Sequence, residues 1–256
     1  MRIVVKVGTS TLAHKTGNLN IRRVEQLCKV LSDLKNSGHE IILVSSGAIG
    51  MGVGKLCLSS RPDDIPGKQA AAAVGQCELM YTYDKLFSEY NHTVAQILIV
   101  GLDIENEIRN QNFKNTLFRL LELGVLPIVN ENDTVSTAEI EIGDNDTLSA
   151  IVAVNVQADL LILLSDIDGL YTADPRSNEN AELICEVCDI TPEIYALAGG
   201  KGSTLGTGGM STKIKAAEMA NSNGIDMVIA NGNAPAILYD IVEGKNVGTK
   251  FLADRK

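Results

Sequence analysis

The stretch DLLILLSD at residues 159–166 decides the fold class of this chain. Its interior is apolar without a break, and it ends in Ser165 and Asp166. A strand that is apolar at every position is buried on both faces, which is typical of a parallel sheet between two layers of helices. Ligands bind such sheets at the carboxyl ends of the strands, which is where this run becomes polar.

Similar β-branched runs recur along the chain, and helical periodicity fills the gaps between them, as in residues 21–34. This alternation predicts an α/β fold with a parallel sheet and with no linker or internal repeat. Two segments break the pattern: residues 134–142 alternate like a small hairpin, and residues 170–187 carry the turn signal Asp174-Pro175. The predicted strands are Ile3–Val7, Glu40–Val44, Val94–Val100, Val125–Asn130, Asp159–Leu164 and Asp226–Ala230.

The 256 residues include 22 Lys and Arg against 32 Asp and Glu, which gives a net charge of −10. An acidic chain without a basic block is a poor candidate for binding nucleic acid or an anionic membrane. No signal peptide is recognisable, and the most apolar segments, 97–100 and 160–164, are far too short to span a bilayer. We therefore expect a cytoplasmic protein.

The five cysteines are odd in number and scattered, so they predict no disulfide framework. Cys185 and Cys188 form a CxxC pair, but no second pair or nearby histidine completes the four ligands of a structural zinc site. We expect two small, partly buried side chains here rather than a metal site.

Glycine and small polar residues follow nearly every predicted strand, as in KVGTS at 6–10, SSGAIG at 45–50 and NEND at 130–133. Glycine in such turns lets backbone N–H groups approach an anion, so several turns on one sheet edge indicate a polyanionic ligand such as a nucleotide. The sequence contains neither a Walker A motif nor a GxGxxG after the first strand, so the two commonest nucleotide fingerprints are excluded.

Two lysines are candidates for contacting that anion. Lys6 interrupts an apolar strand, and a buried ammonium needs a partner, which either a phosphate or a structural carboxylate could supply. Lys213 ends the stretch GTGGMSTK at 206–213, which opens an apolar-periodic helix. Lys213 is either a solvated side chain or a second cation that meets the free N–H groups of this helix start.

The run GDNDTLS at 143–149 predicts another helix start. One of Asp144, Asn145 and Asp146 suffices as the N-cap, which leaves two polar groups to orient a lysine or to bind substrate. Asp133 lies upstream, across the predicted hairpin, and could close on the same site.

Taken in order, the motifs resemble the amino acid kinase family and, within it, the branch of the glutamate 5-kinases. This resemblance runs from Lys6 to about Gly248. It implies a three-layer αβα sandwich on a mainly parallel sheet of about eight strands. It further implies one kinase domain over residues 1–256, with an N-terminal half that binds L-glutamate and a C-terminal half that binds ATP, and without the PUA domain that many relatives carry. The motifs that carry the resemblance are KVGTS, SSGAIG, VNEND, TAEIEIGDNDTLSA, LLSDIDGLYTADPR and GTGGMSTK.

The resemblance also implies roles for individual residues. The expected catalytic residues are Lys6 and Lys213, which match phosphate-contacting lysines, and Asp146, which matches the aspartate that positions them. Magnesium is expected to accompany ATP, with Asp144 and Asp146 as indirect ligands and no direct protein ligand assigned. The expected glutamate-binding residues are Ser46, Asp133 and Asn145. The expected ATP-binding residues are Lys6, Ser165 (commonly threonine in the family), Asp166, Thr207, Gly208, Gly209, Met210, Ser211, Thr212 and Lys213.

The implied reaction moves the γ-phosphoryl group of ATP to the γ-carboxylate of L-glutamate, as the first step of proline biosynthesis. A carboxylate of pKa about 4.3 needs no general base at neutral pH, which fits a chain whose three histidines lie outside the motifs. Two alternatives stay open: a kinase for aspartate, acetylglutamate, carbamate or UMP, and a non-catalytic sensor of a nucleotide or amino acid. The resemblance further implies a homo-oligomer, dimer or tetramer, with feedback inhibition by L-proline.

Overall fold

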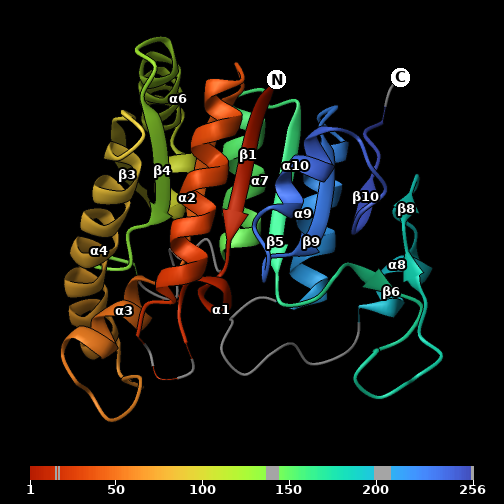
Figure 1. Cartoon of the computed structure of the whole chain (residues 1–256), viewed down its shortest axis with the longest axis horizontal. Helices are drawn as coiled ribbons and strands as arrows, with labels where there is room; N and C mark the ends of the chain where they lie inside the picture. The colour runs from red at the N-terminus through yellow and green to blue at the C-terminus, as the bar shows by residue number, and fades with distance from the viewer. Residues whose placement is uncertain (15, 17, 137–143, 199–208, 255–256) are drawn as a thin grey trace.

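The computed structural model contains one eight-stranded sheet in the order β3-β4-β2-β1-β5-β9-β10-β8 (Figure 1). The structure describes residues 1–14, 16, 18–136, 144–198 and 209–254. A separate antiparallel pair is formed by β6 (Leu170–Tyr171) and β7 (Leu183–Ile184). The strands of the main sheet are β1 (Arg2–Val7), β2 (Glu40–Ser45), β3 (Val94–Ile99), β4 (Leu126–Glu131), β5 (Leu160–Ser165), β8 (Glu186–Val187), β9 (Asp226–Asn231) and β10 (Thr249–Phe251).

All six predicted strands are present, and their boundaries differ from the predicted ones by no more than one residue. Every pairing among these six strands is parallel, which confirms the prediction of a mainly parallel sheet. The sequence analysis missed β10, which pairs antiparallel with β9, and β8, which pairs in parallel with β10 and forms the edge of the sheet. Burial on both faces holds for β4 and β5 but is wrong for β3, because β3 lies at the edge of the sheet and is only partly covered.

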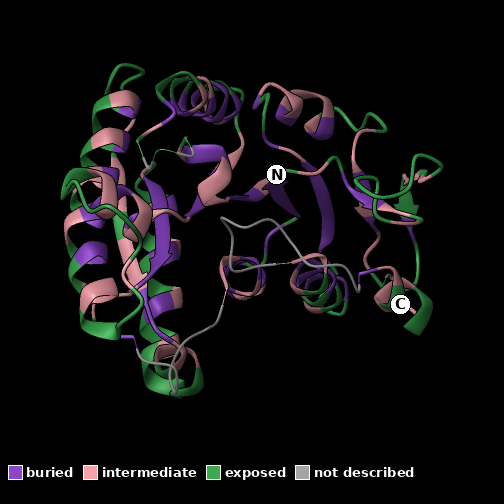
Figure 2. Ribbon diagram, turned by 90° about the horizontal axis from the view of Figure 1, so that it is seen from below, coloured by how far each residue is buried: buried purple, intermediate pink, exposed green. Residues whose placement is uncertain are grey.

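Helices cover both faces of the sheet, and Figure 2 shows the buried strands between the two layers. Residues of α2, α4 and α10 form the apolar core on one face, and residues of α6, α7 and α9 form the core on the other. This arrangement confirms the three-layer αβα sandwich. The helices are α1 (Thr9–Leu12), α2 (Ile21–Asn36), α3 (Ala48–Lys55), α4 (Ile65–Ser88), α5 (Gly101–Glu105), α6 (Glu107–Glu122), α7 (Asn145–Asn155), α8 (Pro192–Leu197), α9 (Met210–Asn221) and α10 (Ile237–Val242).

The side chains of β1 alternate between the two faces of the sheet, as in any strand. Ile3 and Val5 pack in the core that includes α2 and α4, whereas Val4 packs in the core that includes α7 and α9. Lys6 is two residues beyond Val4, so the alternation directs it towards α7 and α9. A lysine in a strand is thereby aimed at two helix starts.

The packing of α3 against α4 depends on two glycines. A Cβ atom at Gly52 would lie 1.8 Å from the carbonyl oxygen of Ala71, and one at Gly75 would lie 1.8 Å from the carbonyl oxygen of Ala48. Any other residue would collide with the facing backbone at both positions. This close approach fixes the start of α3, where the SSGAIG motif lies, against α4.

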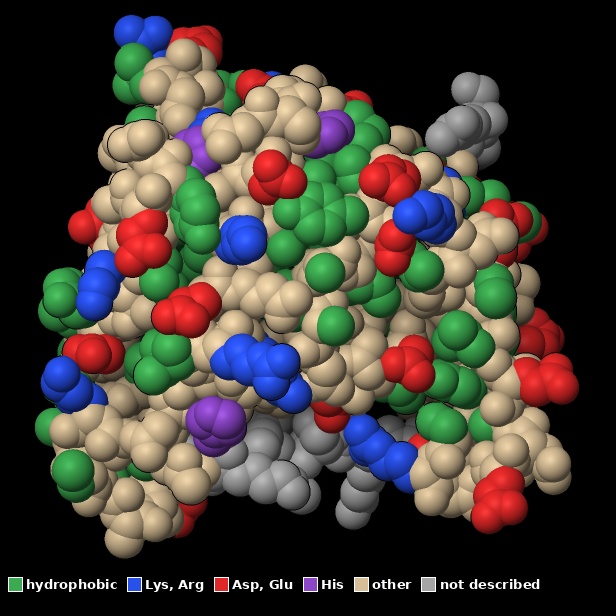
Figure 3. All heavy atoms as spheres, viewed as in Figure 1, with side chains coloured by type: hydrophobic (Ala, Val, Ile, Leu, Met, Phe, Trp, Pro, Cys, Tyr) green, Lys and Arg blue, Asp and Glu red, His purple; other side chains and the backbone are tan. Residues whose placement is uncertain are grey.

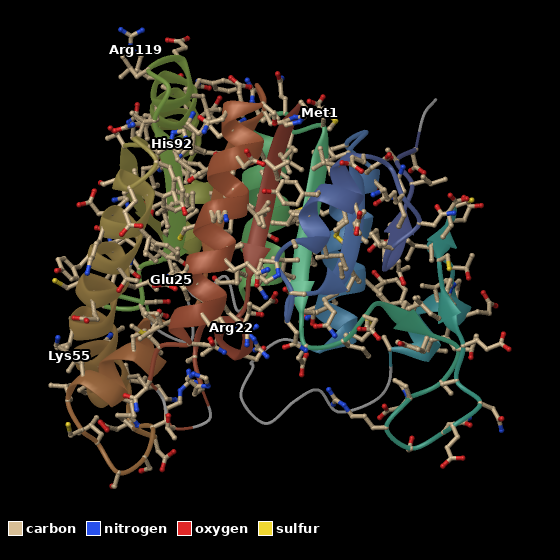
Figure 4. All side chains as sticks on the ribbon, in the orientation of Figure 1. Met1, Arg22, Glu25, Lys55, His92 and Arg119 are labelled. Atoms are coloured by element: carbon tan, nitrogen blue, oxygen red, sulfur yellow. The ribbon has the colours of Figure 1, made fainter. Side chains whose placement is uncertain are left out.

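The carboxyl ends of the parallel strands lie at the lower edge of the view in Figure 1. Figure 4 shows Arg22, near the start of α2, towards this edge, whereas His92 and Arg119 lie at the opposite end of the molecule. Acidic and basic side chains are interspersed over the face seen in Figure 3, without a basic patch. Among the described residues, no helix combines the length and hydropathy needed to cross a membrane.

The excursion predicted at residues 170–187 contains β6, β7 and β8, so it leaves the main alternation as expected. The hairpin predicted at residues 134–142 lies largely outside the described residues. Cys185 and Cys188 are both exposed, so the expectation of partly buried side chains is wrong. The reason is that they flank β8, which is the last strand at this edge of the sheet in the described part of the chain.

Candidate active site

Asp146 is the centre of a buried ion cluster at the start of α7. Its side chain is 1% exposed; Oδ1 lies 2.6 Å from Nζ of Lys6, and Oδ2 lies 2.9 Å from Nζ of Lys213. The hydroxyl of Thr212 donates a further hydrogen bond to Oδ2 at 2.9 Å. Two ammonium groups that share one carboxylate leave an excess of positive charge, which is what an anionic ligand requires.

The cluster answers the question that the sequence leaves open about Lys6. Both lysines are buried, and a structural carboxylate supplies the partner of each. Burial by itself raises the pKa of Asp146, but the charges and hydrogen bonds of the two lysines outweigh it and hold that pKa well below its ordinary value. Asp146 is therefore ionised at neutral pH, and it holds the ammonium groups of β1 and α9 together.

Asp144 forms the N-cap of α7, as one residue of the GDND run was expected to do. Its Oδ1 accepts hydrogen bonds from the backbone N–H groups of Asp146 and Thr147, at 2.9 and 2.8 Å. Asn145 and Asp146 consequently keep their side chains for other contacts. The cap thus aims Asp146 at the lysines.

Asn145 ties α7 to the ends of two neighbouring strands. Its Nδ2 donates to Oγ of Ser46 at 2.7 Å, to the carbonyl oxygen of Ser45 at 3.2 Å and to Oδ1 of Asn130 at 3.2 Å. Ser45 ends β2 and Asn130 lies in β4, so one amide bridges the carboxyl ends of adjacent strands. The predicted glutamate residues Ser46 and Asn145 are in direct contact.

Three helices at this edge, α1, α3 and α9, begin at glycines and have no side-chain cap. Gly47, the N-cap of α3, has φ 101°, a left-handed conformation that favours glycine; Gly209 is the N-cap of α9. First-turn N–H groups without a side-chain acceptor are suited to binding an anion, together with the positive end of the helix dipole. Backbone donors and the two lysines are thus available at the same sheet edge.

The remaining predicted residues that the structure describes lie at the same edge but are not all in contact. Asp133 is half-buried in the turn that follows β4. Ser165 is buried at the end of β5, and its Oγ lies 3.3 Å from Oδ1 of Asp166, which also pairs with Arg176 at 3.2 Å. Gly209, Met210, Ser211 and Thr212 form the start of α9, whereas the predicted residues Thr207 and Gly208 lie outside the described residues.

A sequence profile described as the amino acid kinase family matches residues 1–231. The chain belongs to the amino acid kinase family. Similar curated members include the glutamate 5-kinase of Clostridium perfringens, 57% identical over 99% of this chain and 96% of the relative. Another is the glutamate 5-kinase of Clostridium tetani, 58% identical over 98% of this chain and 94% of the relative.

Solved structures of two other kinases have the same fold as this amino acid kinase. The isopentenyl phosphate kinase of T. acidophilum superposes with a TM-score of 0.68 at 18% identity, covering 98% of this chain and all of that one. The UMP kinase of Bacillus anthracis superposes with a TM-score of 0.65 at 16% identity, covering 99% of this chain and 96% of that one. At these identities the likeness concerns the fold alone.

Membership in a kinase family implies ATP together with a divalent metal ion. Asp144 and Asp146 do not fit as its direct ligands, since Asp144 caps α7 through both oxygens and Asp146 holds two lysines. In the part of the chain that the structure describes, no group of three His, Cys, Asp or Glu side chains could hold a metal ion. The described residues of this amino acid kinase therefore provide no protein cage for the metal.

Sequence reasoning did not single out Asn130 and Gln76, which extend the hydrogen-bond network of Asn145. Asn130 donates from Nδ2 to Oε1 of Gln76 at 2.9 Å, which connects β4 to α4. A signal for Asn130 was present, because it opens the NEND run at the end of a buried strand. Gln76 carries a weaker signal: it is a polar residue in a long helix rich in alanine and glycine, and it is buried.

Proposed function

We infer that this chain transfers the γ-phosphoryl group of ATP to the γ-carboxylate of L-glutamate, forming γ-glutamyl 5-phosphate and ADP in the first step of proline biosynthesis. Relatives more than 50% identical over nearly the whole chain carry the name glutamate 5-kinase. The observation that carries the inference is the pair Lys6 and Lys213 on Asp146, at a sheet edge that also presents uncapped helix starts.

The chemistry requires charge neutralisation rather than a base. A carboxylate oxygen of the substrate attacks the γ-phosphorus, and the bond from that phosphorus to the β,γ-bridging oxygen breaks as ADP leaves. The nucleophile is ionised at neutral pH, so the barrier comes from bringing an anion to an anionic phosphate. Lys6 and Lys213 offset this repulsion, and Asp146 fixes where their charges lie.

We assign the two substrates to different groups of residues at the carboxyl edge of the sheet. Ser46 and Asn145 bind glutamate near the start of α3, and Asp133 pairs with the α-ammonium group. Ser165, Asp166 and the segment 207–213 bind ATP, and Ser165 ends β5, which lies on the other side of β1 from β2. The N-terminal half of a single kinase domain thus provides the glutamate site, and the C-terminal half provides the ATP site.

The divalent metal is proposed to be Mg²⁺ that arrives with the ATP phosphates and keeps several waters. When bound there, it neutralises phosphate charge. This assignment fits the contacts of Asp144 and Asp146, because Asp144 caps α7 and Asp146 pairs with a lysine.

We further propose that the protein is cytoplasmic, forms a dimer or tetramer, and is inhibited by L-proline. These properties are drawn from the family resemblance. Gel filtration tests the oligomer. Titration of the activity with L-proline tests the feedback, and no inhibition up to millimolar concentrations would contradict it.

The function is tested by trapping the acyl phosphate with hydroxylamine while ADP release is followed, in the presence of Mg²⁺. We expect hydroxamate with L-glutamate and little with aspartate, acetylglutamate or carbamate, and no more ADP release with UMP than without an acceptor. Turnover of one of these instead would identify another kinase of the family. A folded protein that binds ATP but turns over no acceptor would be a sensor.

A further inference from the structure

Gln76 of α4 carries a buried hydrogen-bond donor without an acceptor. Its side chain belongs to a residue only 7% exposed, and its Nε2 has no hydrogen-bond partner among the described residues. Buried amide nitrogens are nearly always paired, because an unpaired one has lost its water and gained nothing in return. An acceptor from outside the chain would therefore be bound favourably at this position.

The orientation of this amide is determined by its neighbours. The backbone N–H of Glu131 can only donate, and it donates to Oδ1 of Asn130 at 2.9 Å. Nδ2 of Asn130 must then face the other way, towards Gln76, whose Oε1 accepts from it at 2.9 Å. Flipping Gln76 would bring two N–H groups together, so Nε2 is the atom left over.

The same relay connects Gln76 to the substrate end of the site. Oδ1 of Asn130 also accepts from Nδ2 of Asn145, which in turn donates to Ser46. Gly75, the residue before Gln76, packs against the carbonyl of Ala48 in the first turn of α3. Gln76 therefore lies where the end of β4 meets the start of α3.

The relay leads away from the lysines. In the sheet β2 separates β4 from β1, and neighbouring strands are about 4.8 Å apart, so the backbone of Asn130 lies roughly 10 Å from that of Lys6. A substrate whose reacting carboxylate lies at the lysines extends its other end in this direction. That other end of L-glutamate carries an ammonium group and a second carboxylate.

We propose that Nε2 of Gln76 donates a hydrogen bond to the α-carboxylate of bound L-glutamate. This assignment rests on the proposed function and names the group that distinguishes the substrate from a simple monocarboxylate. Asp133 takes the α-ammonium, the lysines face the γ-carboxylate, and the α-carboxylate is the acceptor that the unpaired donor requires. The contact is the same in ground state and transition state, so its loss raises KM and leaves kcat nearly unchanged.

Three acceptors separate this role from a packing role: L-glutamate, glutarate, which lacks the ammonium, and 4-aminobutyrate, which lacks the α-carboxylate. For Gln76→Leu we expect kcat/KM to fall about 10- to 100-fold with L-glutamate and with glutarate. With 4-aminobutyrate it should stay within about twofold of the wild type; if turnover is too slow, its inhibition constant against L-glutamate replaces kcat/KM. Gln111→Leu, an exposed glutamine on α6, is the matched control and should change none of them.

Each outcome has a defined meaning. An equal loss with all three acceptors, or an unchanged KM for L-glutamate, would overturn the assignment; the latter would show that only water meets Nε2. Should Gln76→Leu fail to fold, Gln76→Glu keeps the shape and replaces the donor by a negative oxygen, so KM for L-glutamate should rise more than that for 4-aminobutyrate. A wild type without glutamate-dependent ADP release would refute the proposed function, whereas an active wild type whose variant keeps its KM refutes Gln76 alone.

Discussion

Lys6 and Lys213 contact opposite oxygens of one carboxylate, that of Asp146, although one lies on β1 and the other on α9. The carboxylate separates two ammonium groups that would otherwise repel each other in a buried setting. It thereby keeps both charges in place, so the proposed phosphoryl transfer would require little rearrangement of the site.

Lys213→Ala should lower kcat by a hundredfold or more, which corresponds to about 3 kcal/mol of transition-state stabilisation. The reason is that one of the two cations proposed to face the transferring group is lost, while glutamate binding is proposed to depend on other residues. Steady-state kinetics with glutamate and ATP varied separately measures the change. Lys215→Ala is the matched control, because Lys215 is exposed on the same helix. An unchanged kcat in Lys213→Ala would remove this lysine from the mechanism.

Asp146→Asn should lower kcat by a similar factor, although Asp146 is proposed to act only through the two lysines and not by contacting substrate. The amide cannot hold two ammonium groups at once, so the lysines lose their fixed positions. The measurement is kcat at saturating glutamate and ATP. Asp240→Asn, which breaks the surface ion pair with Lys245, should leave kcat unchanged. Full activity of Asp146→Asn would show that the lysines need no anchor.

The loss of stability caused by Asp146→Asn should depend on pH. The folded-state pKa of Asp146 is below that of the unfolded chain, about 3.9, so its contribution is complete at neutral pH and is lost as the pH falls below about 4. Removing one partner of a buried ion cluster typically costs about 3–5 kcal/mol. Urea unfolding should therefore show a gap between wild type and Asp146→Asn that is largest near pH 7 and shrinks in acid. A gap that stays constant down to about pH 2 would contradict the depressed pKa.

Asp133→Ala should raise KM for L-glutamate by at least about tenfold and leave kcat nearly unchanged, because it removes the proposed partner of the α-ammonium group. Glutarate lacks that group and provides an internal control: its KM should not rise. The parallel assay of both acceptors decides the assignment. A fall in kcat with KM unchanged would show that Asp133 acts on the reacting atoms instead.

Gly52→Ala should destabilise the fold, since the added Cβ would overlap the carbonyl of Ala71 and force α3 away from α4. Overpacking of this kind costs about 1–3 kcal/mol, which thermal unfolding detects as a lower Tm. Gly50→Ala, in the same helix, meets Thr9 only at an ordinary 3.4 Å and should be neutral or slightly stabilising. Equal Tm values for the two variants would mean that the helices adjust freely.

The sequence by itself determined the local elements. Apolar runs located six strands to within one residue, and the polar run at 143–149 located the start of α7, because periodicity and capping depend on neighbours along the chain. It could not predict β8 and β10, which are too short to form a pattern, nor the exposure of Cys185 and Cys188 beside the edge strand.

Only the tertiary structure decided which side chains meet. From the sequence, the partner of Lys6 could be either a phosphate or a carboxylate. In the fold, β1 lies against α7 and α9, and the partner is the carboxylate of Asp146. The sequence predicted no partner for Asn130. The unpaired donor of Gln76 results from the contact between α4 and β4, in which Gln76 accepts a hydrogen bond from Asn130 through its other amide atom. The physical reason is that a contact between distant segments depends on how a whole sheet is ordered, whereas the periodicity of a strand or helix is written in a few consecutive residues.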